Sequence, residues 1–157
     1  MKKFCIFVFF LCFSLIQVYA QNGYYRGYAG NVGLRAGVAA RGSIGYTVGV
    51  ETVHGFNFGN GAFVGGGVAF SGSLYNNAIV DGFVETKYNI FDAPVSPFVA
   101  VRSGVLVPIV SEPDMAVFVA PGVGIDFSSF SARLAYKMIS MYDQSPRGID
   151  FTISYCF

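Results

Sequence analysis

The chain has 157 residues and a formal net charge of +1, and it is 54% hydrophobic and 17% aromatic but only 12% charged. A soluble domain carries roughly 25% charged residues, so this composition disfavours a molecule whose whole surface faces water. The near-neutral charge argues against nucleic acid or an acidic macromolecule as a partner, and the length suits a single domain.

The first twenty residues read MKKFCIFVFFLCFSLIQVYA. Two lysines precede an apolar run over residues 4–16, and a small-residue end follows it, which is the layout of a secretory signal peptide. The apolar run is shorter than the ~20 residues that a membrane-spanning helix needs. We therefore predict a signal peptide over residues 1–20, cleaved after Ala20, and one mature domain over residues 21–157.

Cysteine usage limits the chemistry of the mature domain. Cys5 and Cys12 leave with the signal peptide, so Cys156 is the single thiol of residues 21–157. Neither an internal disulfide nor a cysteine metal site can then form. No other pattern indicates a metal or an organic cofactor, and we expect none.

The mature domain divides into alternating segments of strand length, separated by turn-forming stretches such as GNG, SGSLYNN, DAPVS and DQSPR. We predict eight strands, in order residues 24–38, 44–58, 62–70, 79–91, 98–109, 115–127, 130–142 and 149–157. An apolar secreted chain without a spanning helix can satisfy its backbone in lipid only by closing a barrel. The expected fold class is therefore all-β, an eight-stranded antiparallel transmembrane up-and-down β-barrel.

The two faces of these strands differ in chemistry. One parity is apolar, as in Val32, Leu34, Ala36 and Val38, and carries no Asp, Glu, Lys or Arg inside the strands. The opposite parity carries five bases and five acids: Arg35, Glu51, Asp81, Glu85, Lys87, Arg102, Asp126, Arg133, Lys137 and Asp150. Glycine and alanine accompany these charges, which is typical of a narrow lumen, because an eight-stranded barrel is barely wide enough for side chains.

This segregation predicts a barrel whose apolar face points outward and whose charges point inward. The alternative is a soluble periplasmic lipocalin-like binding protein, in which the charges face water and the apolar face lines a cavity.

Charges inside a lumen must be paired, because an unpaired charge at low dielectric constant is costly. Counting outward from the turns places Asp126 nearly opposite Arg133, and it places Glu85 diagonal to Arg102 and beside Lys87. We interpret the ten charges as a salt-bridged plug that fills the lumen. The alternative is a small pore or transporter for ions or small solutes.

Aromatic residues gather near the ends of the predicted strands. One rim collects Tyr24, Tyr25, Tyr28, Phe56, Phe58, Tyr88, Phe91, Phe127, Phe130 and Phe157, and the other has Tyr46, Phe70, Tyr75 and Tyr142. Such rings are typical of the girdles that transmembrane barrels place at the water–lipid interface.

His54 is the single histidine of the chain. A catalytic histidine needs a nucleophile or a carboxylate within hydrogen-bond reach. By parity His54 points outward with Thr52 and Phe56 beside it and no acid on that face. We interpret it as a structural residue at the interface, and a membrane-embedded hydrolase is the alternative.

Two further residues carry local expectations. Cys156 falls on the lumen parity, near the expected positions of Arg133 and Lys137, and we interpret it as a small buried residue. Pro121 lies mid-strand on the outward parity, where its missing N–H predicts either a β-bulge over residues 120–122 or a shorter strand.

The C-terminal segment GIDFTISYCF alternates to its last residue, which indicates a strand that is held in place up to the chain end. Together these features resemble the small eight-stranded outer-membrane β-barrel proteins of the OmpA/OmpX type, in the version without a periplasmic domain. The resemblance spans the mature chain and rests on YYRGYAGNVGL, GYTVGVETVHGFNFGNGAFVGGGVAF and FTISYCF.

The resemblance implies a location in the bacterial outer membrane, with the membrane lipid as a partner. It also implies that the barrel assembly machinery reads the C-terminal pattern during insertion, here Phe151, Ile153, Tyr155 and Phe157. We therefore expect a monomeric, non-enzymatic protein with a structural or surface-interaction role in the envelope and no nucleic-acid partner.

Overall fold

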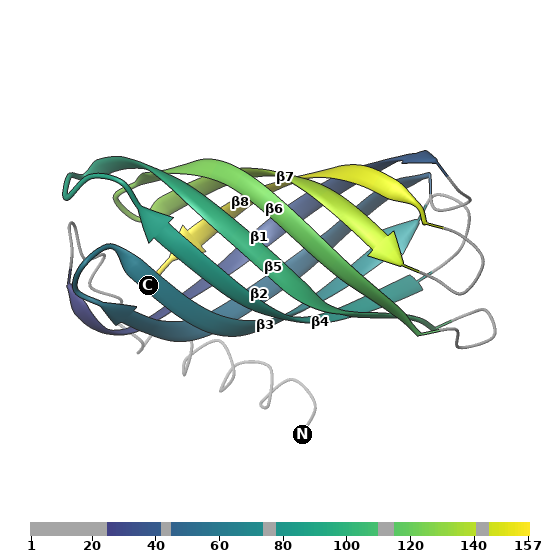
Figure 1. Ribbon diagram of the computed structural model, residues 1–157, viewed down its shortest axis with the longest axis horizontal. Helices are drawn as coiled ribbons and strands as arrows, with labels where there is room; N and C mark the ends of the chain where they lie inside the picture. The colour runs from purple at the N-terminus through teal and green to yellow at the C-terminus, as the bar shows by residue number, and fades with distance from the viewer. Residues whose placement is uncertain (1–24, 42–44, 74–77, 110–114, 141–144) are drawn as a thin grey trace, which may run out of the picture.

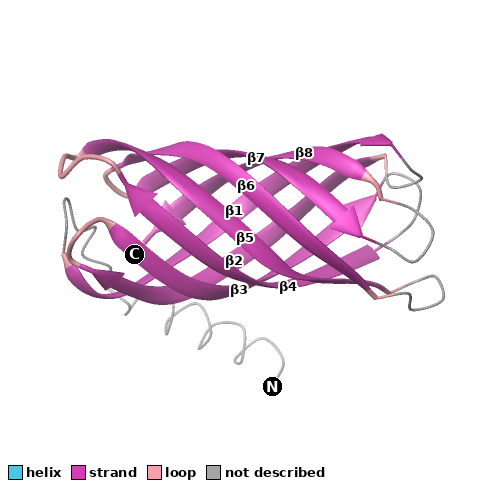
Figure 2. Ribbon diagram, viewed as in Figure 1, coloured by secondary structure: helices cyan, strands magenta, loops and turns pink. Residues whose placement is uncertain are grey.

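The computed structural model describes residues 25–41, 45–73, 78–109, 115–140 and 145–157. Their regular elements are strands that close one antiparallel barrel in chain order (Figures 1 and 2). The eight strands are β1 (Arg26–Arg41), β2 (Tyr46–Phe58), β3 (Ala62–Ser73), β4 (Ala78–Asn89), β5 (Val95–Pro108), β6 (Ala116–Phe127), β7 (Phe130–Ser140) and β8 (Arg147–Cys156). Strand number and topology confirm the predicted fold class.

The predicted signal peptide and its cleavage site lie outside the described residues, as do Tyr24, Tyr75 and Tyr142 of the predicted girdles. Among the described residues there is no helix long and apolar enough to cross a membrane.

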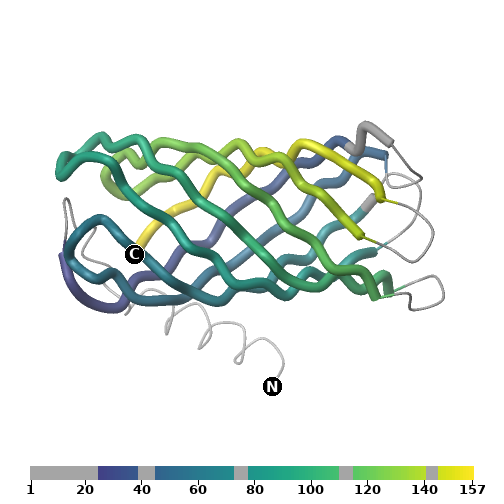
Figure 3. Tube along the Cα trace, in the orientation of Figure 1, coloured from purple at the N-terminus to yellow at the C-terminus, as the bar shows by residue number. Residues whose placement is uncertain are grey.

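The barrel closes where β1 meets β8 (Figure 3). The antiparallel register runs from Asn31 opposite Cys156 to Val38 opposite Ile149. Beyond it, Gly30 and Phe157 exchange both backbone hydrogen bonds, at 2.7 and 2.8 Å. The chain end is therefore part of the ladder, which explains why the alternation in the sequence continues to the last residue.

The fifth strand begins earlier than its sequence pattern predicted, at Val95 instead of residue 98. Pro97 lacks an N–H, but its carbonyl accepts a hydrogen bond from Ile90 N at 2.9 Å. The buried Ser96 accepts another, from Phe91 N to its Oγ at 3.1 Å. Pairing with neighbouring strands thus extends β5 through a residue that, in sequence, resembles the start of a turn.

Both expectations for Pro121 were wrong. β6 continues through it to Phe127, and the register with β7 is the same on both sides, with Val119 opposite Met138 and Gly122 opposite Ala135. A bulge would have shifted that register. The β6–β7 ladder leaves residues 120 and 121 unpaired, so the missing donor of Pro121 is accommodated without a register shift.

The outer face of the barrel is apolar on all eight strands. Leu34 is 68% exposed, Val48 66% and Val117 58%. Among the strand charges whose side chains the structure describes, the exposed ones are Arg26 and Arg147, which lie at the first positions of β1 and β8. This arrangement contradicts the lipocalin-like alternative, because the apolar side chains line the outside and the charges line the inside.

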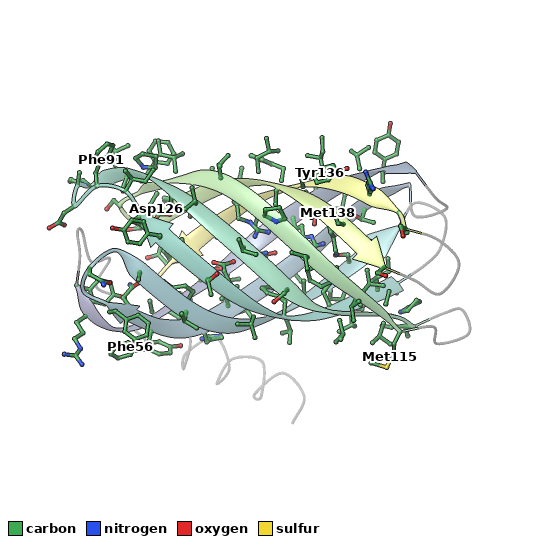
Figure 4. All side chains as sticks on the ribbon, viewed as in Figure 1. Phe56, Phe91, Met115, Asp126, Tyr136 and Met138 are labelled. Atoms are coloured by element: carbon green, nitrogen blue, oxygen red, sulfur yellow. The ribbon has the colours of Figure 1, made fainter. Side chains whose placement is uncertain are left out.

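The two ends of the barrel differ. One end, called the turn end, carries the connections over residues 59–61, 90–94 and 128–129 together with Tyr25 and Phe157. The other end, called the loop end, carries the remaining connections. Exposed rings surround the turn end: Tyr28, Phe56, Phe58, Tyr88, Phe91, Phe127, Phe130 and Tyr155. Figure 4 shows Phe56 and Phe91 at this end and Met115 at the other.

Two members of the predicted turn-end girdle behave differently from the rest. Tyr25 lines an internal cavity, and Phe157 is half-buried against Gly30. Parity alone did not show this, because both lie just outside the strands, where the strand geometry stops. Tyr155 was left out of the prediction and belongs to the girdle, since its ring packs edge-on against Phe130 at 5.5 Å between centroids.

The lumen is filled by large and small side chains that alternate across neighbouring strands. Phe63, Phe83, Phe98 and Phe118 are buried inside, and the sequence analysis did not assign them there. Glycines make the room for these rings: a Cβ on Gly67 would lie 2.7 Å from the Phe83 ring. The lumen is thus a packed core, as expected for eight strands.

Gly104 and Gly82 lie on paired strands and provide a matched test of this packing. A Cβ on the inward Gly104 would lie 2.7 Å from both Cα and Cβ of Phe83, whereas one on Gly82 meets its nearest neighbour, Val105, at 3.9 Å. We expect Gly104→Ala to lower the free energy of unfolding by about 3 kcal/mol or more and Gly82→Ala to change it by less than about 1 kcal/mol. Urea unfolding of the refolded domain, followed by circular dichroism, measures both. Equal effects of the two substitutions would contradict the assigned inward and outward faces.

Candidate functional site

The ten charged residues singled out in the sequence all point into the lumen, where eight are buried and Lys87 and Asp126 are partly buried. A central layer joins Arg102 of β5 to Glu51 of β2 and Glu85 of β4. Arg102 donates to both oxygens of Glu51, each at 2.7 Å, and its Nε donates to Glu85. This bidentate, charge-assisted geometry is among the strongest hydrogen-bonding arrangements in proteins.

Cross-strand register positions this central layer. Glu85 and Arg102 are direct partners in the β4–β5 ladder, one step closer than the diagonal arrangement predicted. Glu51 reaches Arg102 across the lumen from β2. The Arg102 guanidinium also lies over the Phe83 ring, 4.6 Å from its centroid, so an apolar wall supports the charged layer.

A second layer lies toward the loop end. Arg35 donates to Asp81 at 2.5 Å and to Asp150 at 2.7 Å, and Lys137 donates to Asp81 at 2.7 Å. Lys137 Nζ also lies 4.2 Å from the centroid of the Phe118 ring. These four charges come from β1, β4, β7 and β8, so the layer ties opposite walls of the barrel together.

A third group of lumen residues lies at the turn end, and it corrects the prediction for Asp126. Ser131, not Arg133, stands opposite Asp126 in the β6–β7 ladder. Asp126 instead accepts from Lys87 Nζ at 2.9 Å and from Asn89 Nδ2 at 2.6 Å. The predicted inward direction of Asp126 was right. Its partner, however, lies on β4, which is not adjacent to β6, and counting residues outward from a hairpin turn detects partners on adjacent strands only. Asn89, a neutral residue, was missed.

Arg133 differs from the other lumen bases. Its Nη1 lies 3.8 Å from Glu85 Oε2, too far for a hydrogen bond. The buried Nε and Nη1 atoms have no hydrogen-bond partner. Among the described lumen bases it is therefore the one without a hydrogen-bonded carboxylate.

Two cavities lie at opposite ends of the lumen. The turn-end cavity has a volume of about 100 Å³ and is lined by Asn31, Lys87, Asp126 and Cys156, among others. The loop-end cavity, of about 40 Å³, is lined by the residues of the second layer. Glu51, Glu85 and Arg102 line neither cavity, so the central layer separates them. Figure 4 shows Asp126 at the turn end.

Tyr25 closes part of the turn-end cavity, just before β1 begins. Burial raises the pKa of its phenol above the ordinary value, so the group stays neutral. The hydroxyl donates to the carbonyl of Tyr28 at 2.9 Å. This bond turns the side chain inward, away from the aromatic girdle.

Cys156 also lines the turn-end cavity, with Lys87 and Asp126. The prediction that it lies near Arg133 and Lys137 was wrong. The β7–β8 register places Thr152 opposite Arg133 and Gly148 opposite Lys137, so both bases lie farther along the barrel.

His54 lies on the outer face in a chain of hydrogen bonds. The Thr52 hydroxyl donates to the carbonyl of Asn31 at 3.1 Å, and His54 Nε2 lies 2.9 Å from Thr52 Oγ1. Because the single Thr52 proton is used, Nε2 must donate, and Nδ1 accepts from the Tyr28 hydroxyl at 2.5 Å.

This direction of donation is the reverse of what catalysis requires, since a general base takes the proton of its nucleophile. These hydrogen bonds instead satisfy the polar atoms of Tyr28, Thr52 and His54 on an apolar face, which agrees with a structural role for His54. The described residues contain no group of three or more histidine, cysteine or acidic side chains placed to hold a metal ion.

The C-terminal residues lie on the outer face of the last strand. Phe151, Ile153 and Tyr155 are 44%, 50% and 43% exposed. The Phe157 ring covers Gly30, where a Cβ would lie 2.7 Å from the ring, and it meets the His54 ring edge-on at 5.9 Å between centroids.

Comparison with known proteins gives a clear answer for the fold. No protein-family model matches the sequence, and no curated protein matches it. Among solved structures, the neisserial surface protein A is similar with a TM-score of 0.57 at 10% identity, over 82% of this chain and 94% of that one. The outer membrane protein Ail of Yersinia pestis has a TM-score of 0.56 at 13% identity, over 83% and 100%.

The N-terminal β-barrel domain of Pseudomonas aeruginosa OprF has a TM-score of 0.55 at 9% identity, over 85% of this chain and all of that domain. At such low identity the likeness concerns the fold, which these barrels share in strand number and closure. The chain has the fold of the small eight-stranded outer-membrane β-barrel proteins.

Proposed function

We propose that this chain is a non-enzymatic integral protein of the bacterial outer membrane, with a structural or surface-interaction role and a lumen closed by ion pairs. The central layer carries the proposal. Arg102 binds two carboxylates in the part of the lumen between the two end cavities, and Phe83 packs against it. A barrel filled in this way acts through its outer surface and its loops, and not through its lumen.

The outer face supports the membrane location. A continuous apolar belt faces outward on all eight strands, and the closed ladder leaves no sheet edge for lipid to contact. Two structural neighbours are described as an outer membrane protein and a surface protein. Short turns face the periplasm in barrels of this kind, so the turn end, with the chain end, would lie on the periplasmic side.

The C-terminal strand supports a proposal about assembly. Phe157 contacts Gly30 and His54 once the barrel is closed, so any recognition of its ring must precede the pairing of β8 with β1. We expect the assembly machinery to read Phe151, Ile153, Tyr155 and Phe157 at that stage. A closed sheet also offers no edge for strand pairing with a second copy, which favours a monomer.

Removal of Arg102 tests whether the central layer stabilises the barrel. Arg102→Met leaves Glu51 and Glu85 without their donor, and breaking a buried ion pair in this way costs about 3–5 kcal/mol. Adding Glu51→Gln should recover much of the loss, because Glu85 then keeps Arg133 as a counter-charge. Urea unfolding of the refolded domain in lipid vesicles measures both variants. A loss below about 1 kcal/mol in the single variant would contradict a stabilising plug.

Fractionation and gel mobility test the membrane location. A closed membrane barrel resists detergent until it is heated, so unboiled and boiled samples of the outer-membrane fraction should migrate differently. The protein should be absent from the soluble periplasm. A soluble protein without a heat-dependent shift would refute the proposed location and leave the fold unaffected.

Planar-bilayer recording separates the plug from a pore. We expect the refolded domain to give no steady conductance above the protein-free bilayer, because the central layer fills the lumen. A conductance that changes in Arg102→Ala or Glu85→Ala would instead establish the pore. A well-folded Lys87→Gln variant, altered at the turn end, is the matched control for loss of one lumen charge.

A further inference from the structure

Three inward side chains form one row across the seam of the barrel. Thr152 of β8 stands opposite Arg35 in the β1–β8 ladder and opposite Arg133 in the β7–β8 ladder. All three are deeply buried, with exposed fractions of 6% for Arg35, 1% for Thr152 and 5% for Arg133. The register therefore places Thr152 between the two arginines on the inward face of the sheet.

Each member of this row has a buried donor atom without a hydrogen-bond partner. These atoms are Arg35 Nε, Arg133 Nε and Nη1, and Thr152 Oγ1. The two terminal nitrogens of Arg35 donate to Asp81 and Asp150, and its Nε has no partner. Arg133 has no hydrogen-bonded carboxylate at all.

The carboxylates around Arg133 are already occupied. Both oxygens of Glu51 accept from Arg102, and the Glu85 oxygen nearest to Arg133 also accepts from Arg102. Glu85 Oε2 stays 3.8 Å from Arg133 Nη1. A buried charged donor without an acceptor is costly, and natural proteins pair such groups or satisfy them with a bound ion or water.

We propose that the row Arg35–Thr152–Arg133 binds a small monovalent anion of the halide class. The row offers N–H groups from two cations and one hydroxyl, and donors of this kind form charge-assisted hydrogen bonds with an anion. Thr152 is 1% exposed, and a site as enclosed as this favours a monatomic ion over a phosphate or a carboxylate. The site lies within the charged lumen but does not depend on where the protein is located or whether its lumen conducts.

Anomalous X-ray scattering from the wild-type domain crystallised in sodium bromide tests the site directly. We expect a bromide peak within hydrogen-bond reach of Arg133 Nη1 and Thr152 Oγ1. An ordered water at that position, without anomalous signal at high bromide, would overturn the proposal.

Thermal unfolding in detergent gives an independent measurement in solution. A ligand that binds only the folded state raises the midpoint in proportion to ln(1 + [L]/Kd). The midpoint should therefore rise with bromide concentration, relative to the bulky anion gluconate at equal ionic strength. No difference between the two salts at the bromide concentration used for crystallisation would overturn a specific site.

Two substitutions assign the effect to the row. Arg133→Gln should abolish the bromide-dependent rise, whereas Lys87→Gln, which removes an equal charge at the turn end, should retain it. Thr152→Val keeps the side-chain shape and removes one donor, so it should weaken bromide binding about tenfold even if Arg133→Gln does not fold. A full bromide response in Thr152→Val would contradict the proposed set of ligands.

Discussion

Closure of the sheet between β1 and β8 is the constraint on which the rest of the molecule depends. In lipid every backbone donor and acceptor must be satisfied within the protein, and a sheet achieves this only when it has no edge. The ladder reaches this condition through Gly30 and Phe157, the last residue of the chain. Once the ring of strands is complete, one face of every strand becomes a lumen wall and the other an apolar outer surface.

The small circumference of eight strands then dictates the contents of the lumen. Rings such as Phe83 fit because glycines face them, and most of the charged side chains fit because a partner on another strand binds them. Arg102 meets both demands, since it binds two carboxylates and packs on a phenyl ring. The interior is therefore a compact, polar core. This packing is the basis for the proposal that ion pairs fill the lumen.

The same physical rule applies to polar groups on the outside. His54 would be costly on a lipid-facing surface if its ring nitrogens were unpaired. Tyr28, Thr52 and the Asn31 carbonyl form a directed chain that satisfies them, and the ring of Phe157 covers one side. Several described lumen residues keep buried polar atoms without a partner, and the donor atoms of Arg35, Thr152 and Arg133 motivate the proposed anion site.

Period-two alternation predicted the strands, their inward and outward faces and the closed eight-stranded barrel, because side-chain direction in a strand depends only on local backbone geometry. The sequence pattern did not predict which inward side chains contact each other. Asp126 pairs with Lys87 across the lumen, and Cys156 lies beside those residues and not beside Arg133. Contacts of this kind depend on the register between strands and on which inward side chains face each other across the lumen. The tertiary structure alone determines these two quantities, because no local pattern in the chain encodes how far one strand slides past another.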